Sequence, residues 1–557
     1  MKKIIPFLVV ILLIAESLSA QVAGKFWIVF TDKNNSPYSI SNPSAYLSSR
    51  CLARRAKYGI PILYNDLPPN PSYIDSVISK GVKLLNRSKW FNAISIYTTD
   101  TTKMAAIRAL PFVQNSKYVT RVKPHSKDPS FFTETVEPLN WPHNTTNTDS
   151  LNYGSSYNQL HMIHVDCLNN MGFRGKGIQI AQIDARFGEA NQLPAFDTLY
   201  NRGQVLGTWD FVWGITNVYD DTNNVDVHGE ECLSCMAGNL PTQLLGDAMD
   251  ANYYLLRAED APTENMIEDD NWASAAEYAD SAGADVITTS LYYTTFDDAN
   301  TNYKYADMNG RTAVASIAAT ICAEKGMVVC ACAGNLGNNV WHYVGSPDDA
   351  DSILTVGAVD ASGNYASFSS TGPTYDRRVK PDVAAQGVNA AVASPSGGVG
   401  GASGTSFSTP IIAGAVASLW QANPNMTNMQ IIQAIKQSAN QYFSPDSLRG
   451  YGIPNFCNAN SILTGMNGKQ GQSSISEVYP NPFQSSISLG FFSTIQQNVE
   501  IKLYNSIGQV VYENKKKVAG NGNTLISLNG LISLPQGLYL VTIKEESGKV
   551  FTSKVVK

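Results

Sequence analysis

Between residues 153 and 464, short runs of apolar residues alternate with longer stretches in which apolar residues recur at helical spacing. The strand-like runs are 177–183, 253–257, 284–290, 326–331 and 353–359. The helix-like stretches are 272–282, 312–325, 408–421 and 428–438. Near-continuous apolar strands that alternate with helices are typical of a parallel sheet. The pattern therefore predicts an α/β domain over 153–464, with a doubly wound parallel sheet and helices on both faces.

Two flanking regions differ from this pattern. Residues 21–130 mix strand-like and helix-like stretches, which indicates a small α+β domain, and 131–152 is rich in Thr, Asn and Pro, as exposed linkers are. A second linker is expected at 465–474. The remaining residues, 475–557, contain short alternating strands separated by Gly and Asn turns, which predicts a small β-sandwich.

The first twenty residues have the pattern of an export signal. Lys2 and Lys3 give a positive start, an apolar run covers 4–15, and Ala20 offers a small residue before a cut. A membrane anchor is the alternative, but the apolar run is shorter than the roughly 20 residues that a spanning helix needs. We therefore predict a signal peptide over 1–20, which is removed on export.

Composition narrows the classes of function. The chain has 557 residues, a net charge of −6 and 15% charged residues, and its basic residues form no stripe. Nucleic acid is therefore not expected as a partner. Eight cysteines are too few for a disulfide scaffold of this length, although export permits disulfides. Their pairing cannot be read from the sequence.

Residues 404–410, Gly-Thr-Ser-Phe-Ser-Thr-Pro, carry the strongest chemical signal. A glycine-rich approach leads directly into a helix-like stretch, so Ser406 lies at a predicted helix N-terminus. Backbone N–H groups there favour a developing negative charge. Ser406 or Ser408 could instead be a simple N-cap. A cap alone does not explain the flanking glycines or the proline in the first turn, so Ser406 is a candidate nucleophile.

A serine nucleophile needs a base, and the base needs an orienting carboxylate. Among six histidines, His228 stands out because Gly229 and a run of small and apolar residues follow it. Asp184 ends the strand-like run 177–183, and α/β sheets place their sites at the carboxyl ends of strands. Each residue alone is a weak signal, since a strand-end Asp is more often a turn residue and a lone His more often structural.

Together these segments resemble the subtilisin-like serine proteases (subtilases, peptidase family S8) over roughly 153–463. Four segments match in the family's order: 180–184 with Asp184, 228–238 with His228, 331–335 with Asn335, and 404–410 with Ser406. The chain order Asp, His, Ser differs from that of chymotrypsin and the α/β-hydrolases. The resemblance implies a secreted serine endopeptidase with a subtilisin-like fold.

The resemblance also implies a role for each residue. Ser406 attacks the scissile carbonyl to form an acyl-enzyme, His228 takes its proton and later returns it, and Asp184 orients His228. The Asn335 side chain and the Ser406 backbone N–H are expected to hold the oxyanion. This chemistry requires no cofactor, and the expected substrates are proteins or peptides.

Substrate binding is expected at Ser290, Leu291, Tyr292 and Gly334. The strand that ends at Ser290 and Leu291 is similar to the family strand that pairs with an extended substrate backbone. Tyr292 stands where the family usually has glycine and would crowd the groove. The family's side-chain preference therefore does not transfer to this chain.

The sequence departs from the subtilase pattern beside two of the expected catalytic triad residues, Asp184, His228 and Ser406, and this leaves a second function open. Ala185 and Arg186 follow Asp184, and Glu230 and Glu231 follow His228-Gly229, where the family usually has small or hydroxyl residues. Two carboxylates beside a histidine can raise its pKa or pair with Arg186. The alternative function is a catalytically inactive, secreted, subtilisin-like binding protein.

Metal sites are a weaker expectation. Four cysteines in two close pairs could suggest zinc, but Cys-x-Cys suits tetrahedral geometry poorly, so they are interpreted as small buried hydrophobes. An acidic loop before His228 could hold structural calcium, although its spacing is not that of an EF-hand and a solvated loop is the preferred interpretation. These residues are Cys232, Cys235, Cys330 and Cys332 for zinc, and Asp220, Asp221 and Asp226 for calcium.

The flanking domains also resemble known modules. Residues 21–130 are loosely similar to a subtilisin propeptide, which would assist folding and block the groove until it is cut off. Residues 475–557 resemble the sorting domains of type IX secretion, with a generic β-sandwich or a carbohydrate-binding module as the alternative. The resemblance implies export across both membranes of a Gram-negative cell, contact with the secretion machinery, no membrane span after signal removal, and a monomer.

Overall fold

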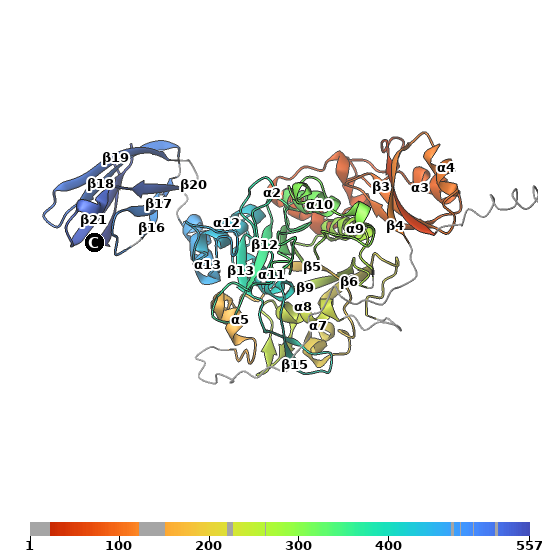
Figure 1. The fold of residues 1–557 in the computed structure, drawn as a ribbon, viewed down its shortest axis with the longest axis horizontal. Coiled ribbons are helices and arrows are strands. Elements are labelled where there is room, and N and C mark those ends of the chain that lie inside the picture. The colour runs from red at the N-terminus through yellow and green to blue at the C-terminus, as the bar shows by residue number, and fades with distance from the viewer. Residues whose placement is uncertain are drawn as a thin grey trace, which may run out of the picture. The chain divides into compact units, whose positions relative to one another are not determined.

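The computed structural model describes residues 23–121, 151–219, 227–261, 263–468, 473–479, 481–493, 495–518 and 522–557. The chain divides into two compact units, Met1–Leu463 and Thr464–Lys557 (Figure 1). The predicted signal peptide, the acidic loop at 220–226 and most of the 131–152 linker lie outside the described residues. No helix in the described ranges is long and apolar enough to cross a membrane.

A seven-stranded sheet forms the centre of the first unit, in the order β13-β12-β11-β10-β5-β9-β6 (Figure 1). All neighbouring strands in it are parallel. The strands are β5 (Gln179–Asp184), β6 (Val205–Asp210), β9 (Asn252–Arg257), β10 (Val286–Thr289), β11 (Val328–Cys332), β12 (Leu354–Val359) and β13 (Val383–Gln386). The predicted parallel α/β sheet is thus confirmed.

Helices cover both faces of this sheet, as the alternation along β5 demonstrates. Ala181 and Ile183 share a hydrophobic core with Trp272 of α9. Gln182 and Asp184 instead bond to α8. Because successive strand residues point to opposite faces, α8 and α9 lie on opposite sides of the sheet.

The helices of this region comprise the predicted ones and several shorter ones. They are α5 (Tyr157–Met162), α6 (Val165–Asn170), α7 (Asp197–Asn201), α8 (His228–Ala237), α9 (Ile267–Ala282), α10 (Val314–Glu324), α11 (Thr405–Ala422), α12 (Asn428–Ser438) and α13 (Phe456–Gly468). Small strand pairs lie outside the main sheet: β7 (Asn239–Leu240) with β8 (Leu244–Leu245), and β14 (Ala390–Ala393) with β15 (Val399–Ala402).

One disulfide closes this region. It joins Cys167 on α6 to Cys457 on α13, across a sequence separation of 290 residues. The other six cysteines are buried thiols. The pairing that the sequence left open is therefore between the start and the end of the α/β region.

The N-terminal part of the same unit is the predicted α+β domain. Its antiparallel sheet has the order β2-β3-β1-β4, and two helices pack on it through Ile74, Val77, Met104 and Ile107. The elements are β1 (Gly24–Phe30), α3 (Pro71–Ile78), β2 (Lys83–Ser88), β3 (Ala93–Thr98), α4 (Lys103–Arg108) and β4 (Val113–Arg121). A further helix, α2 (Ser49–Tyr58), lies between β1 and α3 in the chain and contacts α9 instead (Figure 1).

The second unit is built from two antiparallel sheets around one apolar core, as expected for a β-sandwich. Alternate residues of β18, such as Val499, Ile501 and Leu503, point into this core. The sheets have the orders β16-β17-β20 and β19-β18-β21-β22. The strands are β16 (Ser474–Tyr479), β17 (Ile487–Ser493), β18 (Gln497–Tyr504), β19 (Val510–Val518), β20 (Gly522–Leu528), β21 (Leu538–Lys544) and β22 (Val550–Val556).

Candidate active site

Asp184 and His228 meet at the carboxyl edge of the sheet. Asp184 is the last residue of β5 and His228 the first residue of α8. The His228 Nδ1 donates to Asp184 Oδ1 at 2.6 Å, and both side chains are buried. A hydrogen bond to a carboxylate in such a dry place is short and strong. The structure thus brings together two of the predicted triad residues, which are 44 positions apart in the chain.

The Asp184 carboxylate is itself held in place. The Ala185 backbone N–H donates to Oδ1 at 2.8 Å, and Gln182 Nε2 donates to Oδ2 at 3.0 Å. Gln182 also donates to the Gly229 carbonyl at 2.7 Å. Gln182 is not among the residues predicted from the sequence. A polar residue in an apolar strand, two positions before Asp184 and hence on the same face, was the available signal.

Gly229 explains why a glycine follows the histidine. Its N–H donates to the Arg186 carbonyl at 2.7 Å, which ties α8 to the loop after β5. A Cβ at this position would lie 2.5 Å from the Arg186 carbonyl oxygen and 3.2 Å from Asp184 Cβ. Only glycine permits this close approach.

Ser406 is the second residue of α11, in the buried first turn of that helix. Its carbonyl oxygen accepts hydrogen bonds from Ser290 Oγ at 2.9 Å and from the Cys232 thiol at 3.3 Å. The rings of His228 and the neighbouring Phe407 have centroids 6.3 Å apart. These contacts place the start of α11 beside α8 and the end of β10. Cys232, interpreted from sequence as a small hydrophobe, thus contributes a polar contact.

Asn335 and Gly334 lie just after β11 and also contact the start of α11. The Thr405 N–H and hydroxyl both donate to Asn335 Oδ1, each at 2.9 Å. The Gly334 N–H donates to the Thr405 hydroxyl at 3.2 Å. Thr405 was not singled out in the sequence analysis, although it lies inside the 404–410 motif. It fixes the Asn335 amide by its oxygen end.

Tyr292 lies against Gly334. A Cβ on Gly334 would be 3.3 Å from the Tyr292 ring, and the positive φ of Gly334, 91°, also favours glycine. Ser290 is buried at the end of β10, and Leu291 belongs to the hydrophobic core beneath. The four residues predicted to bind substrate therefore follow the neighbouring strands β10 and β11 at the carboxyl edge.

Glu230, a departure from the family pattern, is a buried carboxyl group with a raised pKa. Its carboxyl group is buried beside Gly188, where an added Cβ would lie 2.9 Å from Oε2. Burial raises the pKa of Glu230 to about 8, and the charges of Glu231 and Glu189 add to the rise. The group is therefore mostly neutral at pH 7.

The four cysteines that could have suggested zinc do not come together. Within the residues that the structure describes, no group of possible metal ligands combines the four cysteines. A different set, Glu259, Glu264 and Glu268, brings carboxylate oxygens within 4.8 Å of one another. Burial raises the pKa of Glu264 and of Glu268 well above the usual value. The preferred interpretation of the 220–226 loop, a solvated acidic loop in place of a calcium site, stays a prediction because that loop lies outside the described residues.

Residues 175–453, half of the chain, match the Subtilase family. The chain belongs to the subtilase family. Two further matches flank this one: residues 25–131 match the peptidase S8 propeptide domain of Bacteroidota, and residues 477–557 match a secretion system C-terminal sorting domain. The resemblances inferred for the three regions are thus confirmed.

Relatives of this subtilase are bacterial serine proteases. Subtilisin E of Bacillus subtilis (strain 168) is 29% identical over 308 residues, which cover 55% of this chain and 70% of that protein. Serine protease AprX of the same strain is 29% identical over 317 residues, covering 52% and 67%. Subtilisin of Bacillus pumilus is 28% identical over 308 residues, covering 55% and 97%.

These matches establish the general activity and destination. The protein is a serine endopeptidase of the subtilase family, made with a propeptide domain. Its type IX sorting domain directs export, to secretion or to the cell surface.

Proposed function

We propose that this subtilase cleaves peptide bonds in proteins through an acyl-enzyme on Ser406. The observation that carries the proposal is the buried 2.6 Å contact of His228 Nδ1 with Asp184 Oδ1, beside the first turn of α11. With Nδ1–H bonded to Asp184, the ring is in the tautomer whose Nε2 accepts a proton. Ser406 Oγ attacks the scissile carbonyl carbon while its proton passes to Nε2, and Asp184 stabilises the imidazolium.

The remaining steps use the same groups. His228 gives the proton to the leaving amine as the C–N bond breaks, which leaves an ester on Ser406. Water then attacks this ester with His228 again as the base, and the acid product leaves. No cofactor enters any of these steps.

Asn335 Nδ2 and the Ser406 backbone N–H are the donors that we assign to the oxyanion. The two bonds from Thr405 to Asn335 Oδ1 support this, because they fix the amide orientation before substrate arrives. The known cost of losing the corresponding asparagine, about 10²–10³ in kcat, was measured in subtilisin itself. That magnitude comes from the family and not from this geometry.

The enzyme prefers substrates that carry small side chains at the cleavage site. The extended substrate pairs with the backbone at Ser290 and Leu291, and the Tyr292 ring occupies space beside Gly334. The mature enzyme acts as a monomer on proteins outside the cell.

The test is labelling of the mature protein with a fluorescent fluorophosphonate, which reacts with activated serines. Wild type is expected to label, Ser406→Ala not at all, and His228→Ala far more slowly, since only the base is lost. Failure of correctly processed wild type to label would overturn the proposal. The inactive binding protein would then be the better description.

A further inference from the structure

An insertion in the propeptide domain leaves its own sheet and lies on the catalytic region. It comprises residues 31–70, between β1 and α3, and is here named the arm; α2 is its central helix. Arg50 of α2 donates to the Gly177 carbonyl at 2.7 Å and to the Gly283 carbonyl at 3.1 Å. These two glycines come just before β5 and β10, so Arg50 bonds the amino ends of both strands.

Other residues of the arm extend this contact along the same edge. Arg54 donates to the Ala284 carbonyl, two residues before β10. Lys325, shortly before β11, donates from Nζ to Asn65 Oδ1 and to Asp66 Oδ2 of the arm, each at 3.0 Å. The arm thus follows the amino ends of three adjacent strands, β5, β10 and β11.

The candidate active site lies at the other end of the same three strands. Asp184 ends β5, Ser290 follows β10 and Asn335 follows β11. A strand of six residues, such as β5, spans about 20 Å. The arm therefore binds the edge of the sheet opposite the candidate active site.

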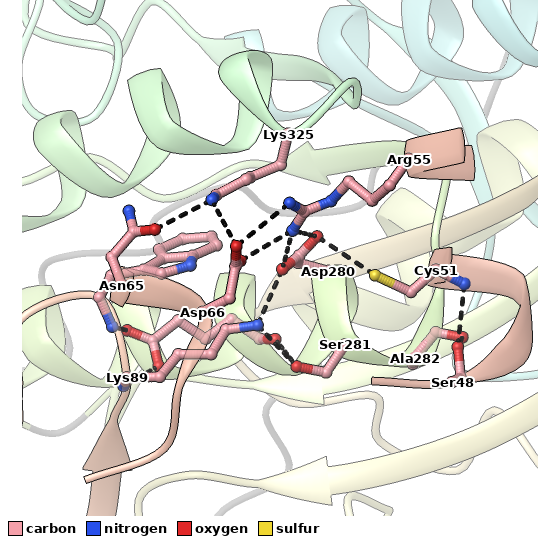
Figure 2. A network of polar contacts seen from close by, with 12 residues as sticks. Ser48, Cys51, Arg55, Asn65, Asp66, Lys89, Asp280, Ser281, Ala282 and Lys325 are labelled. Carbon is pink, nitrogen blue, oxygen red and sulfur yellow. Dashed lines mark hydrogen bonds and ion pairs between the residues drawn. The ribbon is translucent and has the colours of Figure 1, made fainter. Parts of the chain in front are cut away.

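One buried carboxylate on α9 is the centre of this interface (Figure 2). Asp280 accepts from Arg54 at 2.6 Å, from Arg55 at 2.9 and 3.0 Å, and from Lys89 at 2.8 Å. Although burial opposes ionisation, the charges of Lys89, Arg54 and Arg55 hold the pKa of Asp280 well below its usual range. Three cations from the propeptide domain thus converge on one carboxylate of the catalytic region.

A second carboxylate, Asp66, belongs to the arm, and here the cation comes from the catalytic region. Asp66 accepts from Arg55 at 3.0 Å and from Lys325 of the catalytic region at 3.0 Å (Figure 2). One turn before Asp280, Glu277 accepts from Ser88 Oγ at 2.5 Å and from the N–H of Lys89 at 2.6 Å. Among the described residues, the hydrogen bonds to the carboxylates of Asp280 and Glu277 come from the propeptide domain.

We infer that the arm is an anchor separate from the substrate groove, which keeps the propeptide domain bound to the enzyme after the connecting linker is cut. On the catalytic side, Asp280 is the residue that contributes most to the binding of the propeptide domain. Dissociation breaks several charge-assisted hydrogen bonds at once, before water replaces them, and this slows release. Release of the propeptide domain removes Arg54, Arg55 and Lys89 from Asp280, so these ion pairs belong to the complex.

The test uses the full chain with Ser406→Ala, so its outcome does not depend on catalysis. A recognition sequence for an unrelated site-specific protease is inserted between residues 131 and 150, the predicted linker. After cutting, release of the propeptide domain is followed by size-exclusion chromatography. The parent should retain it, whereas Asp280→Asn should release it roughly 100-fold faster, because one side of a buried ion network is lost.

The matched control is Asp250→Asn, which removes a carboxylate that pairs with Arg202 at 2.9 Å outside the interface. It should release the propeptide domain at the parental rate. Arg54→Gln tests the propeptide side and leaves the catalytic region unchanged; it decides the question alone if Asp280→Asn does not fold. Release of the Asp280 and Arg54 variants at the rate of the Asp250 control would overturn the inference.

Discussion

Gly229→Ala probes how finely the sheet edge positions the catalytic histidine. The substitution adds a single methyl group next to His228 and changes no charge. In the native structure this methyl carbon would lie 2.5 Å from the Arg186 carbonyl oxygen and 3.2 Å from Asp184 Cβ. The Arg186 contact is with backbone, so α8 must move for it to be relieved.

The size of the effect follows from that distance. Contacts of a Cβ under 3.0 Å essentially do not occur, so the start of α8 must shift by at least about 0.5 Å. The shift would strain the 2.7 Å bond from the Gly229 N–H and the 2.6 Å contact of His228 with Asp184. Since a misplacement of about 1 Å costs on the order of 100-fold in rate, we expect kcat/KM to fall by roughly 10- to 100-fold.

The assay is kcat/KM on a fluorogenic peptide, with the active enzyme counted by fluorophosphonate titration. Gly398→Ala is the matched control, because a Cβ there meets nothing within 4 Å. It should retain wild-type activity. Wild-type kcat/KM in Gly229→Ala would refute the argument that this backbone contact positions His228.

Three further predictions address pH, specificity and stability. Burial in the complex raises the pKa of Glu277 to about 7 from its usual 4.5, so the complex holds a proton that the released enzyme gives up. Propeptide binding should therefore weaken as pH rises, by up to about tenfold per unit until pH 7, and Glu277→Gln should flatten this dependence of the release rate. Tyr292→Gly should raise kcat/KM for peptides with bulky residues at the cleavage site relative to small ones; an unchanged ratio would place Tyr292 outside the pocket. Cys167→Ser, in a Ser406→Ala background, should lower the free energy of unfolding in denaturant titrations by about 2–4 kcal/mol, and an unchanged midpoint would count against a stabilising disulfide with Cys457.

Regular apolar patterns made the central fold predictable, and irregular ones did not. The five predicted strands correspond to β5, β9, β10, β11 and β12. The edge strands β6 and β13 were not predicted, because β13 is short and β6 is interrupted by polar residues and glycine. The contact between the arm and the catalytic region could not be predicted from the sequence either. Arg54 and Arg55 look like solvated helix residues until Asp280, 226 and 225 positions away, is brought to them.

Individual residues of the site were predictable where they stand beside a recognisable local pattern. Asp184 ends an apolar strand and His228 precedes a glycine, and the structure places them in contact. The supporting groups were harder to find because their identity depends on distances across the fold. Gln182 bridges Asp184 and Gly229, and Cys232 bonds the Ser406 carbonyl, yet both could equally be ordinary interior residues in a sequence.

The bond between Cys167 and Cys457 makes the α/β region nearly a closed ring of chain. Each cysteine lies on a helix near one border of this region, and the propeptide and sorting domains lie beyond these borders. A cut that detaches either flanking domain therefore leaves α6 and α13, near the two ends of the enzyme, covalently joined. In surroundings that contain active proteases, unravelling from a chain end is a main route to digestion. Here a loose end can unravel only as far as its cysteine before the opposite end holds it.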